Sequence, residues 1–335
     1  MKNLRKLSAV WAIVITAAIA LSFAACARKG GDPYKGGGIS IGAMNGATMI
    51  GLAKLDRDAK DGKNLYTVEK VGAPDLITAG LVKKTYDAAA LSCNSAAILF
   101  NNKDADIQVA AVNVLNVLYL VASSDITVNS LADLKGRKVH CTGARAVPEY
   151  VFRYLAEKNN LSGLDVDFYA EPTEIVQGLI KGAVKIAVLP QPAATQAIKA
   201  AAAQGQNLKI CLDLADEWKK IEGNADKEII TGVLIVRKAY LTNNKETFDT
   251  FLQKYKESVD FMKDPAHLGE AAQYVADLGI TPNTAIAEEA LPLCGLAYMD
   301  GETMQEKVTA FLQILYGQNK DFVGGKMPAD GFYYK

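Results

Sequence analysis

The chain has 335 residues, of which half are hydrophobic, and its 37 Lys and Arg residues are matched by 37 Asp and Glu residues. A formal net charge of +0 provides no general attraction to a phosphate backbone. The composition therefore excludes a role that depends on nucleic-acid binding. The length is sufficient for two domains of ordinary size.

The N-terminus has the layout of a secretory signal. Lys2, Arg5 and Lys6 form a short basic segment, and residues 7–25 carry no charge. This order, a positive region before an apolar core, is typical of an export signal. The apolar core is close to the length of a membrane-spanning helix, so a retained membrane anchor is the alternative. We predict that residues 1–25 are a signal peptide.

The end of the apolar segment predicts a lipid anchor. Phe23-Ala24-Ala25-Cys26 places small residues before a cysteine and resembles the lipobox of bacterial lipoproteins, except that Phe23 stands where the pattern prefers Leu. The resemblance implies that Cys26 is lipidated, with palmitate among its acyl groups, and becomes the first residue of the mature chain. More than one acyl chain gives stable anchoring. Residues 26–38 are rich in glycine and predict a flexible tether.

The remaining cysteines and the histidines do not form a metal-binding pattern. Cys93, Cys141, Cys211 and Cys294 contain no C-x-x-C pair, and the chain has only two histidines, His140 and His267. We therefore expect no metal site and no cofactor. An oxidising compartment permits disulfides, but the wide spacing and apolar neighbours favour buried free thiols.

From residue 39 onwards, short apolar strands alternate with amphipathic helices. The expected strands are residues 39–43, 65–71, 87–91, 107–112, 115–123, 138–141, 165–169, 185–189, 208–214 and 230–236. Pro74 and Pro148 each open a helix in the positions where proline is tolerated. The chain beyond residue 236 is expected to be helical. Such alternation predicts an α/β protein with parallel sheets and helices on both faces.

The strand–helix cycle restarts near Leu131, after a long extended stretch. One doubly wound sheet could hold all the strands, but the restart favours two doubly wound lobes joined by a two-strand hinge. We expect the chain to cross to the second lobe near Ser123 and to return near Thr231. Lobe I then contains residues 39–122 plus 232–335, and lobe II contains residues 123–231.

The sequence resembles the type II periplasmic binding-protein superfamily, in particular the group that includes taurine- or sulfonate-binding and thiamine-pyrimidine-precursor-binding proteins. The most specific segment is S-L-A-D-L-K-G-R-K-V at residues 130–139. At the level of order and spacing, the resemblance extends over nearly all of the mature chain. The other matching segments are residues 39–46, 75–91, 174–190 and 232–240.

The resemblance implies a substrate-binding lipoprotein of an ABC importer, held on the extracytoplasmic side of the cell membrane, in the periplasm or at the cell surface. Its partners would be a small solute, such as a sulfonate-like anion or a vitamin precursor, and an ABC permease with its ATPase. We expect a monomer. The superfamily also includes enzymes, the pyrimidine-precursor synthases and menaquinone-pathway lyases. The cysteine-rich motif of the synthases is missing here. A surface lipoprotein without a transport role is a further alternative.

Ligands of open α/β sheets bind outside the carboxyl ends of the strands, and this rule selects the candidate ligand-binding residues. They are Asn45, Gly46, Asn94, Ser95, Asn113, Gly143, Arg145 and Gln191. Each has a structural alternative, since Asn45 and Gly46 form a common turn pair and Asn94 or Ser95 could cap a helix. No catalytic set of side chains stands out.

Arg145 gives the sharpest functional hypothesis. A fixed positive charge beside a helix N-terminus, in a loop that contains glycine, could hold an anionic head group. The alternative is an ordinary exposed loop arginine. Trp218 is expected at a rim or a lobe surface rather than in a ligand-stacking position.

Overall fold

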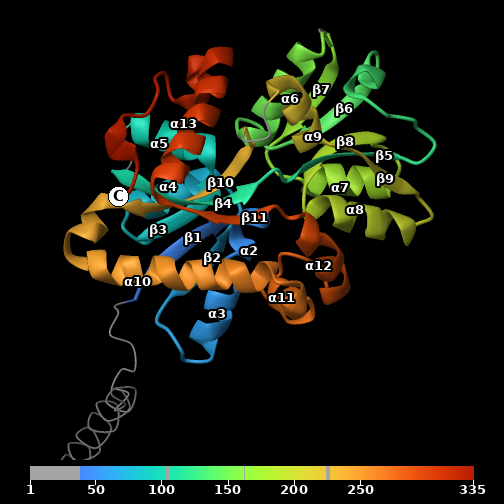
Figure 1. Ribbon diagram of the computed structural model, residues 1–335. Coiled ribbons are helices and arrows are strands. Elements are labelled where there is room, and N and C mark those ends of the chain that lie inside the picture. The colour runs from blue at the N-terminus through green and yellow to red at the C-terminus, as the bar shows by residue number, and fades with distance from the viewer. Residues whose placement is uncertain (1–37, 103–105, 162, 224–226) are drawn as a thin grey trace, which may run out of the picture. The chain divides into compact units, whose positions relative to one another are not determined.

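The computed structural model describes residues 38–102, 106–161, 163–223 and 227–335, and it contains two β-sheets with helices packed against them (Figure 1). Both sheets belong to one compact unit, residues 36–335. The predicted signal peptide, the lipidation site Cys26 and residues 26–37 of the tether lie outside the described residues. The α/β class with two sheets is confirmed.

The first sheet has six strands in the order β11-β4-β10-β3-β1-β2. β1 runs parallel to β2 and β3, whereas β10 is antiparallel to both β3 and β4. The strands are β1 (Ser40–Met44), β2 (Thr67–Val71), β3 (Ala88–Ser92), β4 (Ile107–Leu115), β10 (Ile230–Arg237) and β11 (Leu296–Met299).

The second sheet has five strands in the order β7-β6-β8-β5-β9. β6 runs parallel to β7 and β8, and β5 is antiparallel to β8 and β9. The strands are β5 (Leu118–Ser123), β6 (Lys138–Thr142), β7 (Asp165–Tyr169), β8 (Ile186–Pro190) and β9 (Leu208–Asp213). In the first sheet, β10 and β11 thus run antiparallel to the other four strands, and in the second sheet β5 runs antiparallel to the other four.

The chain passes between the sheets twice, and the first passage lies earlier than we expected. β5, which we placed at the end of the first lobe, pairs entirely with strands of the second sheet. The first passage is therefore the short segment Asn116–Val117 rather than Ser123. The return lies between the end of α9 (Leu214–Glu222) and the start of β10 at Ile230. All residues of β5 are buried, so its sequence carries no alternation that would identify its partner strands.

Three hydrophobic clusters organise the helices. The largest is shared, because it contains buried side chains of both sheets together with α4 (Pro74–Val82), α5 (Cys93–Asn102), α6 (Val147–Lys158), α9 and α13 (Gly301–Gln318). The opposite face of the first sheet is covered by α2, α3, α10, α11 and α12, and the opposite face of the second by α7 and α8 (Figure 1). The shared cluster is thus continuous across the passage between the sheets.

The remaining helices have the following bounds: α2 (Ala47–Ile50), α3 (Ala53–Lys60), α7 (Thr173–Ile180), α8 (Ala193–Ala202), α10 (Lys238–Lys263), α11 (Leu268–Asp277) and α12 (Thr284–Ala290). Pro74 and Pro148 lie in the first turns of α4 and α6, as predicted. The segment after residue 236 is not purely helical, because β11 adds an edge strand to the first sheet. With only four residues, β11 gives too short a pattern to be distinguished from a loop.

Trp218 does not lie at a rim. It is fully buried on α9, between Tyr154 of α6 and Phe311 of α13, with ring centroids 4.9 and 5.9 Å away. Our expectation of a surface aromatic was wrong because α9 was not foreseen, and this helix turns the indole into the shared cluster. Trp218 therefore contacts helices that pack on both sheets.

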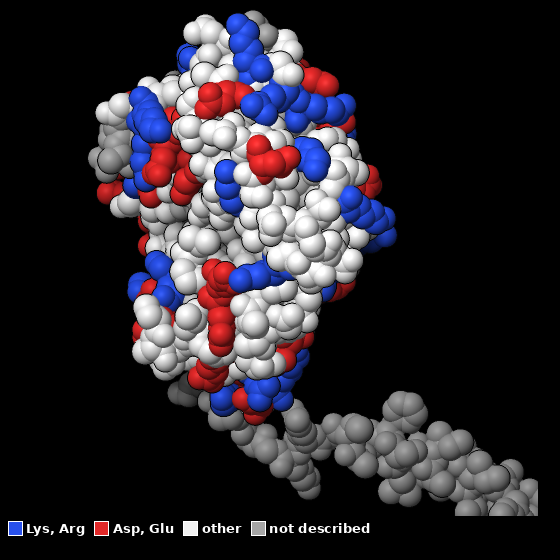
Figure 2. Space-filling view, turned by 90° about the vertical axis from the view of Figure 1, so that its right-hand side faces the viewer, with Lys and Arg blue, Asp and Glu red and all other residues white. Residues whose placement is uncertain are grey.

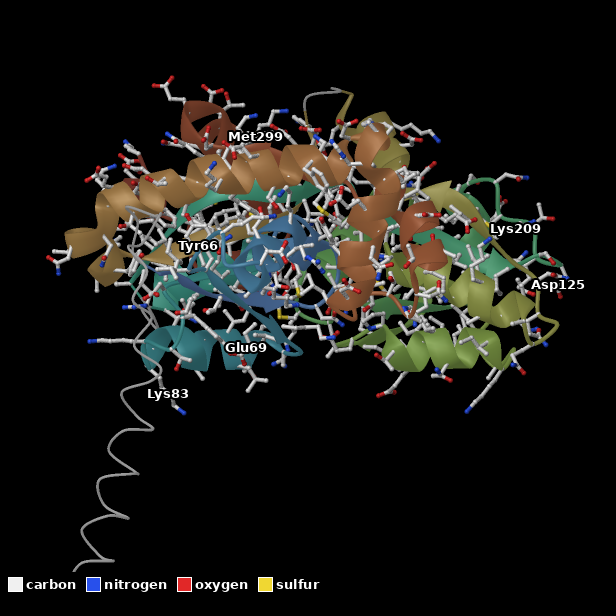
Figure 3. All side chains as sticks on the ribbon, turned by 90° about the horizontal axis from the view of Figure 1, so that it is seen from below. Tyr66, Glu69, Lys83, Asp125, Lys209 and Met299 are labelled. Carbon is white, nitrogen blue, oxygen red and sulfur yellow. The ribbon has the colours of Figure 1, made fainter. Side chains whose placement is uncertain are left out.

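The surface carries charges of both signs. On the face shown in Figure 2, lysine and arginine are interspersed with aspartate and glutamate, without a broad field of one sign. Figure 3 shows Lys209 and Asp125 at the same outer end of the second sheet, far from Tyr66, Glu69 and Lys83 beside the first. Lys209 lies on the edge strand β9, where a charged side chain discourages pairing with another chain. Within the described residues, no helix is both long and apolar enough to cross a bilayer.

Candidate functional site

The candidate residues lie where the two sheets meet. Asn94 follows β3 and Arg145 follows β6, while Gln191 follows β8, and Asn113 and Thr231 lie on the strands next to the two passages. We call these five residues, together with the loops that carry them, the crossing region. The region combines the carboxyl ends of strands from both sheets, which is where ligands bind in open α/β folds.

Asn94 links the two sheets directly. Its side chain is fully buried at the start of α5, and its Nδ2 donates a hydrogen bond to the carbonyl oxygen of Arg145 at 3.3 Å. Asn94 therefore does more than cap its own helix, because its side chain contacts a loop of the other sheet. The neighbouring Ser95 instead contacts Ser92, with 2.7 Å between the hydroxyl oxygens.

Asn45 and Gly46 form the turn between β1 and α2. Asn45 is exposed, and its backbone N–H donates to Val71 across the sheet edge at 3.0 Å. Gly46 has φ 108°, a value that residues with a Cβ rarely adopt, and a Cβ there would have no neighbouring atom within 4 Å. The turn thus leaves room for close approach to the backbone, while the Asn45 side chain is not enclosed by the protein.

The loop after β6 has an unusual backbone and an acidic partner. Gly143 and Arg145 have φ values of 76° and 62°. The Arg145 side chain is exposed, whereas its backbone N–H donates to Oε2 of Glu149 at 2.7 Å. Oε1 of the same carboxylate accepts from Nε of Arg153, also at 2.7 Å. Glu149 was not among the residues that we predicted, although an acid in the first helical turn, four residues after Arg145, is the spacing that allows this contact.

Asn113 and Gln191 are buried amides held by the backbone. Asn113 Nδ2 donates to the carbonyl of Thr48 at 3.0 Å. Gln191 is fully buried, and its Oε1 accepts from the N–H of Thr195 at 3.2 Å, inside the first turn of α8. The backbone N–H of Gln191 donates to Val117 in the first passage at 3.1 Å. Both amides are therefore fixed in orientation beside the first passage.

Several buried polar atoms in this region lack a hydrogen-bond partner. Across the described residues, the unpartnered buried side-chain atoms at the crossing are Asn94 Oδ1, Asn113 Oδ1, Gln191 Nε2 and Thr231 Oγ1; those elsewhere are Asn101 Oδ1, Trp218 Nε1, Tyr255 OH and Gln318 Nε2. Buried polar atoms are normally paired, and each unpaired one costs about 1–3 kcal/mol. Tyr255 OH approaches the Asn113 amide, so the atoms of this set that remain at the crossing without a nearby side-chain partner are Asn94 Oδ1, Gln191 Nε2 and Thr231 Oγ1.

The described residues contain no cluster of His, Cys, Asp and Glu side chains able to hold a metal ion. Cys93, Cys141 and Cys294 are buried free thiols, and Cys211 is half-buried. Burial raises the pKa of each of these four thiols, so none has the character of an activated nucleophile.

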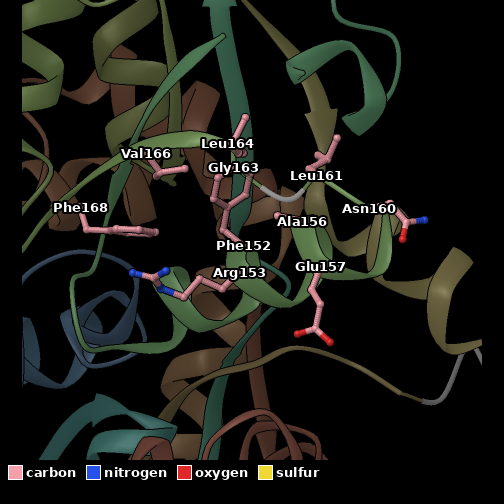
Figure 4. Close-up of a pocket in the computed structure, with 10 residues that line it drawn as sticks. All are labelled: Phe152, Arg153, Ala156, Glu157, Asn160, Leu161, Gly163, Leu164, Val166 and Phe168. Carbon is pink, nitrogen blue, oxygen red and sulfur yellow. The ribbon is translucent and has the colours of Figure 1, made fainter. Parts of the chain in front are cut away.

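A separate cavity of about 480 Å³ lies at the edge of the second sheet, between α6 and the edge strand β7 (Figure 4). Its wall is mainly apolar and includes Phe152, Leu164 and Phe168. The guanidinium of Arg153 lies 4.3 Å from the centroid of the Phe168 ring. None of the predicted ligand-binding residues lines this cavity. We base the site on the crossing region instead, because the unpartnered polar atoms gather there.

Comparisons with known proteins agree with this fold. An ABC transporter protein from Parabacteroides distasonis is 21% identical, with a TM-score of 0.72 over 89% of this chain and 98% of the other. The periplasmic aliphatic sulphonate binding protein SsuA from Escherichia coli is 13% identical, with a TM-score of 0.68 over 89% and 92% of the two chains. The periplasmic nitrate-binding protein NrtA from Synechocystis PCC 6803 is 13% identical, with a TM-score of 0.62 over 86% and 84%.

At these identities, the similarity to solved structures establishes the fold. A comparison with curated protein sequences found no match. A family model, by contrast, matches residues 70–267, which is more than half of the chain, and it spans α5, β5, α6, β8 and β10. The resemblance noted from the sequence is thereby confirmed, and the chain belongs to the NMT1/THI5-like family.

Proposed function

We propose that this protein is the extracytoplasmic substrate-binding component of an ABC importer, and that a small polar solute binds in its crossing region. Membership of the NMT1/THI5-like family supports a binding role, as do the structural neighbours that are named for binding sulfonate and nitrate. The observation that carries the proposal is the group of buried, unpartnered polar atoms on loops and strands of both sheets. A role in binding rather than catalysis agrees with the buried, inactivated thiols.

We further propose that the two sheets form two lobes that close over the solute. The backbone connects them at Asn116–Val117 and again in the segment between α9 and β10, and these two passages would act as a two-strand hinge. Closure would remove the polar groups of the solute from water and replace that hydration with Asn94, Gln191 and loop backbone groups. The contact from Asn94 to Arg145 is one that a hinge opening would break.

The remaining parts of the proposal concern the membrane and the partners. Export through residues 1–25 and lipidation of Cys26 would hold the protein on the extracytoplasmic side, in the periplasm or at the cell surface. A closed, liganded monomer would then dock on a permease whose associated ATPase supplies the energy. The residues proposed to contact the solute are Asn45, Gly46, Asn94, Ser95, Asn113, Gly143, Arg145 and Gln191.

Native mass spectrometry of the purified protein tests solute binding directly. We expect a small molecule to remain bound at one copy per chain and to be lost on denaturation. Asn94→Ala should reduce its occupancy, because the buried amide would no longer be available to it. Asn102→Ala, an exposed change at the far end of the same helix, is the matched control and should retain the solute. Equal retention in both variants would remove the crossing region from the proposal.

The anchor has an independent test. Cells grown with an alkyne-tagged fatty acid should label the protein, and Cys26→Ser should abolish both the labelling and the membrane association. Unchanged membrane association of Cys26→Ser would favour the alternative of a retained apolar helix at residues 7–25. Co-purification of a permease with the wild-type protein would separate transport from a surface role without transport.

A further inference from the structure

We propose that Asn116 is the pin of the hinge. Its backbone and its carboxamide join the two passages side by side, so that the second sheet turns against the first at the link between Asn116 and Val117. This inference rests on the proposed closure of two lobes over a solute, and it names the residue that governs this motion. Asn116 is not one of the residues proposed to contact the solute.

The two passages are bonded to each other at Asn116. Its backbone N–H donates to the carbonyl oxygen of Ile229 at 3.1 Å. In return, the N–H of Ile229, at the end of the second passage, donates to Oδ1 of Asn116 at 3.0 Å. Ile229 is fully buried, so water does not readily replace these bonds. The pair thus ties the chain that leaves the first sheet to the chain that returns to it.

The Asn116 side chain continues the hydrogen-bond ladder of the first sheet beyond its last strand pair. Leu115, the final residue of β4, lies opposite Ile230 of β10. At Asn116 the backbone leaves the ladder, because its φ of 48° lies in the left-handed region. Asparagine tolerates this region better than most residues with a Cβ. Glycine would adopt the same backbone but has no oxygen to offer, so asparagine combines the turn with the acceptor.

The neighbouring residues determine where the pivot lies. On the side of the first sheet, the N–H of Leu115 donates to Gly295 at 2.8 Å, and a Cβ on Gly295 would lie only 1.7 Å from the Leu115 carbonyl oxygen. On the side of the second sheet, the carbonyl of Val117 accepts from the N–H of Gln191 at 3.1 Å. The partners therefore change from one sheet to the other between Asn116 and Val117, and a rotation at this link breaks none of these bonds.

The second passage is held to the first sheet in the same way. The carboxylate of Glu228 lies 2.7 Å from Nζ of Lys307 on α13, which packs on β4 and β10. Together with the bonds of Ile229, this ion pair attaches the returning chain to the first sheet before β10 begins. The pin thus makes the two passages turn as one unit, whereas without it each could bend separately.

Loss of the Asn116 oxygen should favour an opened arrangement of the sheets. The buried N–H of Ile229 would then have no acceptor, and it would regain one only when the passages separate and water enters. Trp218 reports such an opening, because it is fully buried and its ring lies 5.9 Å from that of Phe311 on α13. Separation of the sheets would remove this cover and expose the indole to solvent.

Acrylamide quenching of Trp218 fluorescence in the ligand-free protein tests the inference. A Trp11→Phe background leaves Trp218 as the only tryptophan of the chain. Asn116→Gly keeps the left-handed backbone and removes the oxygen, and we expect it to raise the quenching constant by about 2- to 10-fold, the effect of one lost hydrogen bond. Asn160→Gly is the matched control, since Asn160 has a φ of 54° and is exposed, and it should not change the quenching.

Asn116→Asp separates the role of the oxygen from that of the backbone. It keeps an oxygen that accepts from Ile229, so its quenching should stay close to that of the wild type. The pin is disproved if Asn116→Gly is quenched like the wild type, or if Asn116→Asp is quenched as strongly as Asn116→Gly. Asn116→Ala also lacks the oxygen and repeats the test if Asn116→Gly does not fold. No solute enters these measurements, so a failure of the pin is distinct from a failure of the proposed function, which native mass spectrometry of the wild type judges.

Discussion

Tyr150 of α6 stacks on Phe322, with ring centroids 3.8 Å apart and an interplanar angle of 14°. The two rings come from opposite sides of the passage between the sheets, because α6 packs on the second sheet and Phe322 follows α13, which packs on the first. Trp218 and Phe311 form a second contact of the same kind, 5.9 Å apart. These aromatic pairs join helices that pack on different sheets, so they would oppose the proposed hinge opening.

Phe322→Ala should weaken this contact between the sheets. We expect a loss of about 1–2 kcal/mol in the free energy of unfolding, since the ring is half-buried and stacked. In addition, small-angle X-ray scattering of the ligand-free protein should show a larger radius of gyration than for the wild type. Phe261→Ala is the control. It removes a stacked and half-buried ring from helices that pack on the first sheet alone, so it should lower the free energy of unfolding without changing the radius of gyration. An unchanged radius for Phe322→Ala would mean that the stack does not restrain the sheets.

Arg237→Met should destabilise the first sheet strongly. The Arg237 guanidinium contacts Asp87 at 2.7 Å, and its Nε donates to the carbonyl of Tyr86 at the same distance. Both charged side chains are mostly buried, so removal of one leaves the other without a partner, at a cost of about 3–5 kcal/mol. Urea unfolding would measure the loss. Lys256→Met breaks the exposed pair with Asp260 and should change stability by less than about 0.5 kcal/mol; similar losses in the two variants would contradict this account.

His140 should make the protein less stable in mild acid. Burial lowers the pKa of His140 below its usual value of 6.5, against the opposing effect of Asp167, while Lys138 lowers it further. The unfolded chain therefore binds the proton more readily than the folded one. This contribution is complete above pH 6.5 and is lost as the pH falls through the folded pKa.

His140→Gln should remove that part of the pH dependence, because glutamine does not titrate. Urea unfolding of both proteins from pH 7.5 down to about pH 5 would measure the difference. His267→Gln changes the other histidine, which is half exposed, and should follow the wild-type profile. A wild-type profile that matches His140→Gln throughout would disprove the prediction.

Arg145→Ala tests whether the exposed Arg145 guanidinium contacts the solute, as proposed. If it makes no contact, the affinity should change by less than about 2-fold. A charge-assisted bond to an anion would instead contribute about 1.5–3 kcal/mol, or at least 10-fold in affinity. Isothermal titration calorimetry with the ligand that native mass spectrometry identifies would decide between these outcomes.

The four described cysteines should differ in reactivity. In a Cys26→Ser background, native protein treated with iodoacetamide should be labelled first at Cys211, which is half-buried, and much more slowly at Cys93, Cys141 and Cys294, which are buried. Denaturation should expose all four as free thiols. Peptide mass spectrometry would locate the label, and Cys211→Ser should remove the fast reaction. A disulfide between any two of them would contradict the structure.

The crossing region was predictable in part because polar residues interrupt an otherwise apolar pattern. Asn94, Asn113 and Gln191 each stand at or beside the end of a buried strand, so their positions in the sequence already placed them at sheet edges. Their free atoms were not predictable, because a hydrogen bond such as that from Asn113 to Thr48 joins segments 65 residues apart. The contact between Glu149 and the backbone of Arg145 was likewise hidden, since an acid in the first turn is common in helices.

The sequence alone determined the α/β class, the order of nearly all elements and the loops that carry the site, because strand and helix periodicity and proline positions are local properties. Tertiary structure decided which sheet receives β5, whose uniformly buried residues suit the interior of either sheet. It also decided that Trp218 lies between helices of both sheets and that two of the buried amides keep an unused acceptor and an unused donor at the crossing. These features depend on contacts between residues far apart in the chain, and such contacts leave no periodic signal in the sequence.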